Sequence, residues 1–73
     1  MTRLRPIAGP ELVKLLCNAF GFSVLRIKGS HATLNKDTLY VTVPLKEIRV
    51  GLLSRILKDC GISREEYLKR LWK

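Results

Sequence analysis

Three short segments rich in β-forming residues follow one another in the middle of the chain, at residues 22–28, 31–34 and 38–43. Gly29 and Ser30 separate the first two, and the Asn-Lys-Asp run at 35–37 separates the last two. Both are typical turn sequences. Because connections this short join antiparallel neighbours, the centre of the chain predicts a three-stranded antiparallel sheet. Pro44 is expected to end its last strand.

Strand parity assigns side chains to the two faces of this sheet, since successive residues point to opposite sides. We expect one face to form the core, with Leu25, Ile27, Ala32, Leu34, Leu39, Val41 and Val43. The other face then carries Arg26, Lys28, His31, Thr33, Tyr40 and Thr42. The first strand is the less regular one, because Phe22 and Val24 fall on this outer side.

A helix is predicted before the sheet, over residues 10–20. Its apolar residues recur at helical spacing and form one stripe: Leu12, Leu15, Leu16, Ala19 and Phe20. Pro10 suits the first helical position, because the N–H group that proline lacks would have no partner there. Gly21 stands where a left-handed residue commonly ends a helix.

Two more helices are predicted after a short connection at 45–49. The first runs from Val50 or Gly51 to Cys60, and Gly61 ends it. Its buried stripe is Leu53, Ile56, Leu57 and Cys60. Ser63 and Glu66 have the spacing of a capping box, which predicts a last helix over residues 64–72. Ile62 and Tyr67 flank this box at the positions of a hydrophobic staple, and Trp72 ends the helix.

The order of these elements predicts an α+β fold: α-β-β-β-α with a short C-terminal helix. A sheet with one apolar face needs a cover, and the two amphipathic helices supply it. This is the layout of the double-stranded-RNA-binding domain. At 73 residues we expect a single domain over 1–73, with a core at about 10–71.

The net charge of the chain indicates which classes of partner it can bind. Lys and Arg number 14 against 6 Asp and Glu, which gives a net charge of +8. This excess indicates a polyanionic partner: nucleic acid, an anionic membrane or an acidic protein. One His and two distant Cys form no zinc pattern, so we expect no metal and no cofactor. Cys17 and Cys60 are interpreted as reduced thiols, with a disulfide between them as the alternative.

No uncharged stretch is long enough to span a bilayer or apolar enough for a signal sequence. We therefore expect a cytoplasmic protein without a membrane partner.

Four sequence pieces stand in a recognisable order: GF at 21–22, RIKGSH at 26–31, VTVP at 41–44 and GLLSRILKDCGIS at 51–63. Together they resemble the HicA (YcfA-like) family of small toxins, whose pattern is a GF start, R-x-x-G-S-H, a V-P strand end and G-T-L-x-x-I-L-x-x-A-G. The resemblance covers about residues 10–71. Two positions depart from it: no His follows Pro44, and Leu52 stands at the Thr of G-T-L.

The resemblance implies the double-stranded-RNA-binding fold and a metal-independent endoribonuclease that cleaves mRNA and arrests translation. It also implies neutralisation by a HicB-like antitoxin. The functional histidine of the family lies in G-S-H, which is His31 here.

The residue types around His31 also fit metal-independent RNA cleavage when they are considered without the family resemblance. Metal-free RNA cleavage uses the 2′-OH as an internal nucleophile and needs an acid or base near pH 7, the range of histidine. Arg26 and Lys28 share the predicted face of His31, and the backbone of Gly29 and Ser30 offers N–H groups to an anion. We therefore predict His31 as the catalytic residue and these four as RNA-binding residues.

One histidine cannot be acid and base at once. A Lys, Tyr40 or water must supply the other proton transfer. The leading alternative is a non-catalytic RNA-binding module of the same fold. A third hypothesis is that the chain is an interaction protein whose basic surface binds only an acidic partner. Loss of cleavage on replacing His31 separates the first two readings, and salt-sensitive RNA binding separates both from the third.

Overall fold

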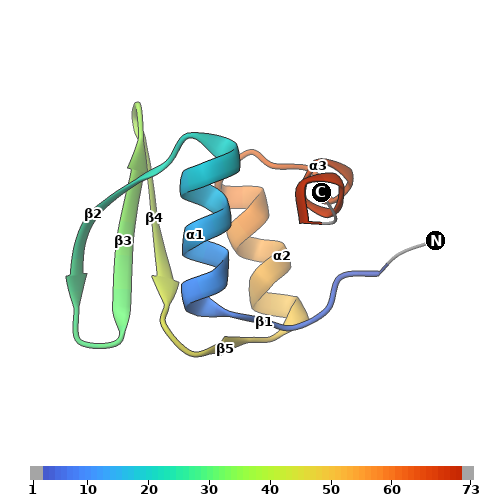
Figure 1. Ribbon diagram of the computed structural model, residues 1–73, viewed down its shortest axis with the longest axis horizontal. Coiled ribbons are helices and arrows are strands. Elements are labelled where there is room, and N and C mark those ends of the chain that lie inside the picture. The colour runs from blue at the N-terminus through green and yellow to red at the C-terminus, as the bar shows by residue number, and fades with distance from the viewer. Residues whose placement is uncertain (1–2, 72–73) are drawn as a thin grey trace.

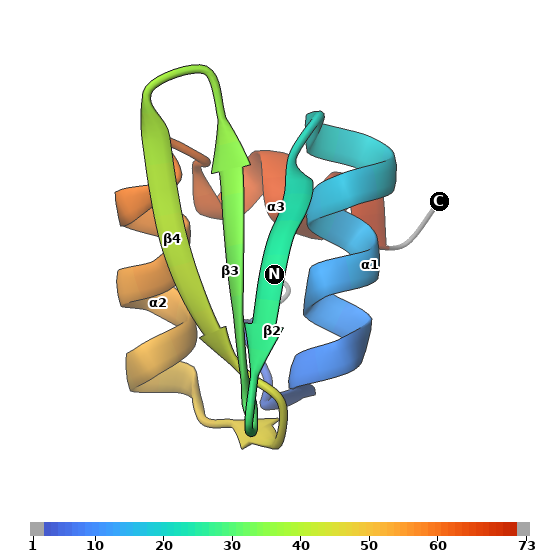
Figure 2. The same cartoon turned by 90° about the vertical axis from the view of Figure 1, so that its left-hand side faces the viewer.

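A computed structural model describes residues 3–71 as one three-stranded sheet with helices on a single face (Figure 1). The elements in chain order are β1 (Ile7–Ala8), α1 (Gly9–Phe20), β2 (Ser23–Lys28), β3 (His31–Lys36), β4 (Leu39–Pro44), β5 (Glu47–Ile48), α2 (Val50–Asp59) and α3 (Arg64–Leu71). The strand order is β2-β3-β4, and both pairs are antiparallel. Seen from the other side, no helix lies in front of the sheet (Figure 2). The predicted α+β fold is confirmed.

The two main helices end as their sequences predict. Gly21 follows α1 with a φ of 78°, and its N–H donates to the carbonyl of Leu16. Gly61 has a φ of 73° just beyond α2. Both conformations are left-handed and cost glycine little, because it has no Cβ.

The capping box before α3 is formed. The Ser63 Oγ accepts a hydrogen bond from the Glu66 N–H at 3.1 Å, and the Glu66 carboxylate accepts one from the Ser63 N–H at 3.4 Å. Ile62 and Tyr67 are both buried beside it. The helix is described to Leu71, and the predicted last residue, Trp72, lies outside the described residues.

The core lies between the sheet and the helices. Its members from β3 and β4 are those that parity predicted: Ala32, Leu34, Val41 and Val43. The helices contribute Leu12, Leu16, Leu53, Ile56, Leu57 and Tyr67, strand β5 contributes Ile48, and the connections contribute Phe22, Cys60 and Ile62. Parity together with helical spacing was enough to find most of this core.

Three residues expected in the core, Leu25, Ile27 and Leu39, are 55%, 60% and 40% exposed. The expected outer placement of Phe22 and Val24 was also wrong, because Phe22 is buried in the core and Val24 pairs with the buried Leu34. β2 is an edge strand that bows away from the helices (Figure 1). Its pairing with β3 shifts register between Val24 and Arg26, so Leu25 has no partner across the ladder. Leu39 begins β4 at the hairpin end, which projects beyond α1 (Figure 1).

The second turn also differs from its prediction at 35–37. β3 continues through Lys36, and the chain reverses at Asp37 and Thr38. Asp37 has a φ of 54°, which suits a two-residue hairpin because positive φ follows the twist of the strands. The Asn35 side chain donates to the Asp37 carbonyl at 2.9 Å, so it supports the turn from within the strand.

A second, two-stranded sheet pairs a segment before α1, for which no element was predicted, with the segment predicted as a connection at 45–49. β1 pairs with β5 through Ile7–Ile48 and Ala8–Glu47. The Gly9 N–H then donates to the Lys46 carbonyl at 2.8 Å. This ladder fixes the start of α1 against the link between β4 and α2.

Cys17 and Cys60 are not bonded to each other in the structure. Cys60 is buried at the end of α2. Burial raises the pKa of its thiol to about 11, and the neighbouring Asp59 carboxylate adds to the effect.

Candidate functional site

The predicted site residues gather at the tight turn between β2 and β3. Gly29 and Ser30 form this turn, and Gly29 has a φ of 60°. Lys28 and His31 are therefore direct partners across the hairpin, and Arg26 faces Thr33 one row further along. Side chains of directly paired residues lie on the same face of an antiparallel sheet. Arg26, Lys28 and His31 thus share one face, as parity predicted.

His31 lies between Lys28 and Pro44, its partner on β4. Beyond Pro44, the Leu45 N–H donates to the Ser30 carbonyl at 2.6 Å. The Gly29–Ser30 turn is therefore anchored to the end of β4, which limits the movement of the backbone that carries His31. The side chain of His31 itself is exposed.

We call the surface opposite the helices the open face. By register it carries Arg26, Lys28, His31, Thr33, Asn35, Tyr40, Thr42 and Pro44. No Asp or Glu occurs in β2, β3 or β4. Lys36 belongs to the other side, where its Nζ lies 5.8 Å from the centre of the Phe22 ring. Arg26 and Lys28 are thus the two strand cations of the open face, and no strand carboxylate offsets them.

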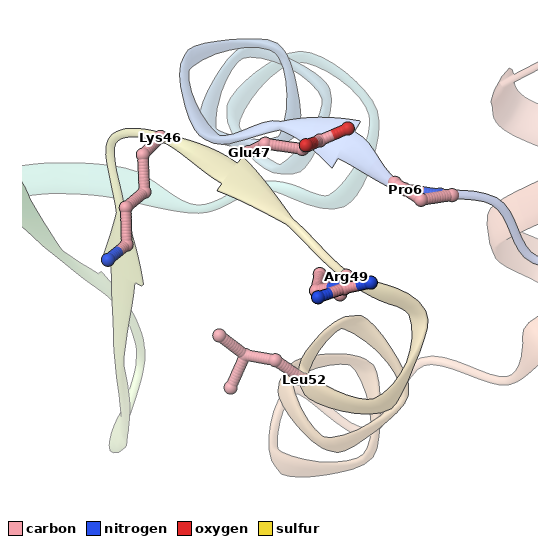
Figure 3. A pocket seen from close by; sticks show the side chains of 5 residues that line it. All are labelled: Pro6, Lys46, Glu47, Arg49 and Leu52. Atoms are coloured by element: carbon pink, nitrogen blue, oxygen red, sulfur yellow. The ribbon is translucent and has the colours of Figure 1, made fainter.

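Sequence reasoning missed a second basic feature, next to the turn. A hollow of about 640 Å³ lies between the link after β4 and the start of α2, lined by Pro6, Lys46, Glu47, Arg49 and Leu52 (Figure 3). The sequence signal was present as two cations three residues apart, on either side of β5. The sequence did not predict this feature because the β1–β5 ladder, which shapes the link, has only two residues in each strand and so shows no periodicity.

No group of three His, Cys, Asp or Glu side chains within residues 3–71 is placed to hold a metal ion. Over the same range, no helix has the length and apolarity needed to cross a membrane.

A comparison with family models decides where this chain belongs. The family described as "HicA toxin of bacterial toxin-antitoxin" matches residues 9–62, which is most of the chain. The chain belongs to the HicA toxin family. A comparison with curated proteins gives no match.

The HicA match runs from the first residue of α1 to just beyond α2 and includes the whole three-stranded sheet. Membership implies an antitoxin as partner, because these toxins belong to toxin–antitoxin systems. The family consists of mRNA-cleaving toxins, which supports a nuclease activity for this member. Both statements concern the family and assign no role to an individual residue.

Proposed function

We propose that this protein is a metal-independent endoribonuclease that cleaves mRNA on its open face, with His31 as general acid–base. The observation that carries the proposal is the pairing of Lys28 with His31 across the anchored hairpin turn. It puts a cation and a proton-transfer group side by side on a face whose strands carry no carboxylate.

The reaction follows from RNA chemistry. His31 takes the proton from a 2′-OH, the 2′-oxygen bonds to the adjacent phosphorus, and the bond to the 5′-oxygen breaks. The products are a 2′,3′-cyclic phosphate and a 5′-OH end. Lys28 and Arg26 stabilise the negative charge that grows on the phosphoryl oxygens. Gly29 and Ser30 bring exposed backbone close to the same phosphate.

The leaving 5′-oxygen needs a proton from another group. Tyr40 pairs with Asn35, whereas Pro44 pairs with His31. Four residues of strand therefore separate Tyr40 from the row of His31, about 13 Å at the usual rise per residue. This is too far for Tyr40 to act on the same phosphate. Water or a nearby Lys completes the reaction instead.

The partner implied by the family fits the same face. We propose that a HicB-like antitoxin places an acidic surface over Arg26, Lys28 and His31. The net charge of +8 favours an acidic partner, and covering this face would block RNA. A complex that contacts the helices alone and leaves His31 open to solvent would contradict this mode of inhibition.

The test replaces His31 by Ala. The side chain is exposed and lies outside the core, so the free energy of unfolding should change by no more than roughly 0.5 kcal/mol. RNA binding should persist, while cleavage should fall on the order of 10²-fold or more. Tyr40→Ala, on the same face but distant from the turn, is the matched control and should cleave normally.

An unfolded His31→Ala protein would show that the residue is structural. A folded variant with wild-type cleavage would refute its catalytic role. If the wild type binds RNA with strong salt dependence but never cleaves it, the non-catalytic RNA-binding module replaces the nuclease.

A further inference from the structure

We propose that the hollow beside the turn binds the single-stranded RNA that continues beyond His31. Lys46 and Arg49 contact its phosphates, and Leu52 packs against a base. The inference rests on the proposed function, and it assigns a substrate subsite outside the open face.

The hollow lies within reach of RNA held at His31. Pro44 is the strand partner of His31, and Lys46 follows two residues later. Paired Cα atoms are at most about 5.5 Å apart and each further residue adds at most about 3.8 Å, so the Cα atoms of His31 and Lys46 lie within about 13 Å. At roughly 3.4 Å per stacked nucleotide, a few nucleotides cover this span.

The lining has the chemistry of a nucleotide site. Lys46 and Arg49 are exposed cations, and Leu52 keeps 43% of its surface exposed although it is apolar. A nucleotide offers a phosphate to the cations and the flat face of a base to the leucine. The volume of about 640 Å³ falls in the range of sites that hold small ligands.

The side chains are arranged to suit this occupant (Figure 3). Lys46 extends from the link after β4 and Leu52 reaches from α2 toward the same space, with Arg49 above the first turn of the helix. The Glu47 carboxylate, which would repel a phosphate, points away from both, on the side of β1. Lys46, Arg49 and Leu52 therefore line the hollow together, and Glu47 lines it too, with its carboxylate lying toward β1.

The backbone of the hollow is fixed before RNA arrives. The Lys46 carbonyl accepts the hydrogen bond from the Gly9 N–H at 2.8 Å, and the β1–β5 ladder follows directly. Arg49 precedes α2 in an extended conformation, and its side chain makes no capping hydrogen bond. Among residues 3–71, the side chains of Lys46 and Arg49 make no hydrogen bond that holds the fold, which suits them to bind a ligand.

The experiment measures binding of a short unstructured single-stranded RNA by the His31→Ala protein, which leaves the RNA intact. Lys46→Ala combined with Arg49→Ala should make the slope of log K against log salt shallower by about 1.4, since each lost phosphate contact removes about 0.7. The matched control is Lys14→Ala with Lys69→Ala, two exposed cations on α1 and α3. This pair should leave the slope unchanged.

Leu52→Ala gives a second and different signature. It removes apolar contact without charge, so affinity should fall on the order of fivefold with an unchanged salt slope. Leu39→Ala, a leucine of similar exposure at the far end of the sheet, should have no effect.

Two results overturn the proposal, and they are distinguishable. If RNA binds with a steep salt slope and the hollow variants behave like their controls, the subsite is refuted and the proposed function stands. If the His31→Ala protein and the wild type both fail to bind RNA in a salt-dependent way, the proposed function fails and the subsite fails with it.

Discussion

Replacing Gly9 by Ala should destabilise the fold strongly, although the same change usually favours a helix. A Cβ at Gly9 would overlap the Pro44 carbonyl oxygen and lie 2.8 Å from the Leu45 Cα, both of which are backbone atoms. The start of α1 must then move off the link after β4, and the Gly9–Lys46 hydrogen bond is strained or lost. Overpacking typically costs about 1–3 kcal/mol and the hydrogen bond adds about 1 kcal/mol, against a gain of at most about 1 kcal/mol in helix propensity.

We expect a net loss of about 2–3 kcal/mol in the free energy of unfolding. A chain of 73 residues has a stability of only about 4–11 kcal/mol. The melting temperature should fall by about 10–20 °C, measured by far-ultraviolet circular dichroism and checked by urea denaturation.

Gly51→Ala is the matched control for this prediction. Gly51 also lies in the first turn of a helix, but a Cβ there meets no heavy atom within 4 Å. The substitution should raise stability by up to about 1 kcal/mol. A Gly9→Ala protein as stable as the wild type, or one that shifts in the same direction as Gly51→Ala, would refute the close approach of α1 to the Pro44–Leu45 backbone.

Two other substitutions test buried groups. The Tyr67 hydroxyl is buried and has no hydrogen-bond partner among residues 3–71. Tyr67→Phe should therefore leave the free energy of unfolding unchanged in urea denaturation, or raise it by up to about 1 kcal/mol. A loss above about 1 kcal/mol would reveal a partner for the hydroxyl. The pKa of the Cys60 thiol is about 11 in the folded protein, against an ordinary value of 9.0 for the unfolded chain. Between these pH values the unfolded chain binds fewer protons than the folded one. The free energy of unfolding therefore falls as pH rises, by roughly 2–3 kcal/mol in total. Cys60→Ala should flatten this alkaline decline, and an unchanged pH profile would contradict the shift.

Sequence alone determined those parts of the protein that depend on neighbours along the chain. Gly21 and Gly61 end their helices and Ser63 caps the next one, because each satisfies backbone groups only a few residues away. The Gly29–Ser30 turn makes Lys28 and His31 partners by local geometry. Parity then placed Arg26 on the same face, so the candidate site was readable before any tertiary contact was known.

Tertiary structure alone decided which of the inward-facing strand residues are covered. Ile27 is paired with Ala32, which is fully buried, yet 60% of Ile27 is exposed. Parity gives the direction of a side chain, whereas burial depends on whether a helix extends over it. The edge strand bows away, and the hairpin that carries Leu39 projects past α1, so neither stretch is covered.

The short ladder between β1 and β5 also required the three-dimensional structure. Two residues on each side show no periodicity, and Ile7 and Ile48 lie 41 positions apart. Their pairing exists because the helices and sheet bring both segments to one end of the molecule. The same closure leaves no room for a side chain at Gly9 and forms the hollow at Lys46 and Arg49 from residues that the sequence presents only as a connection.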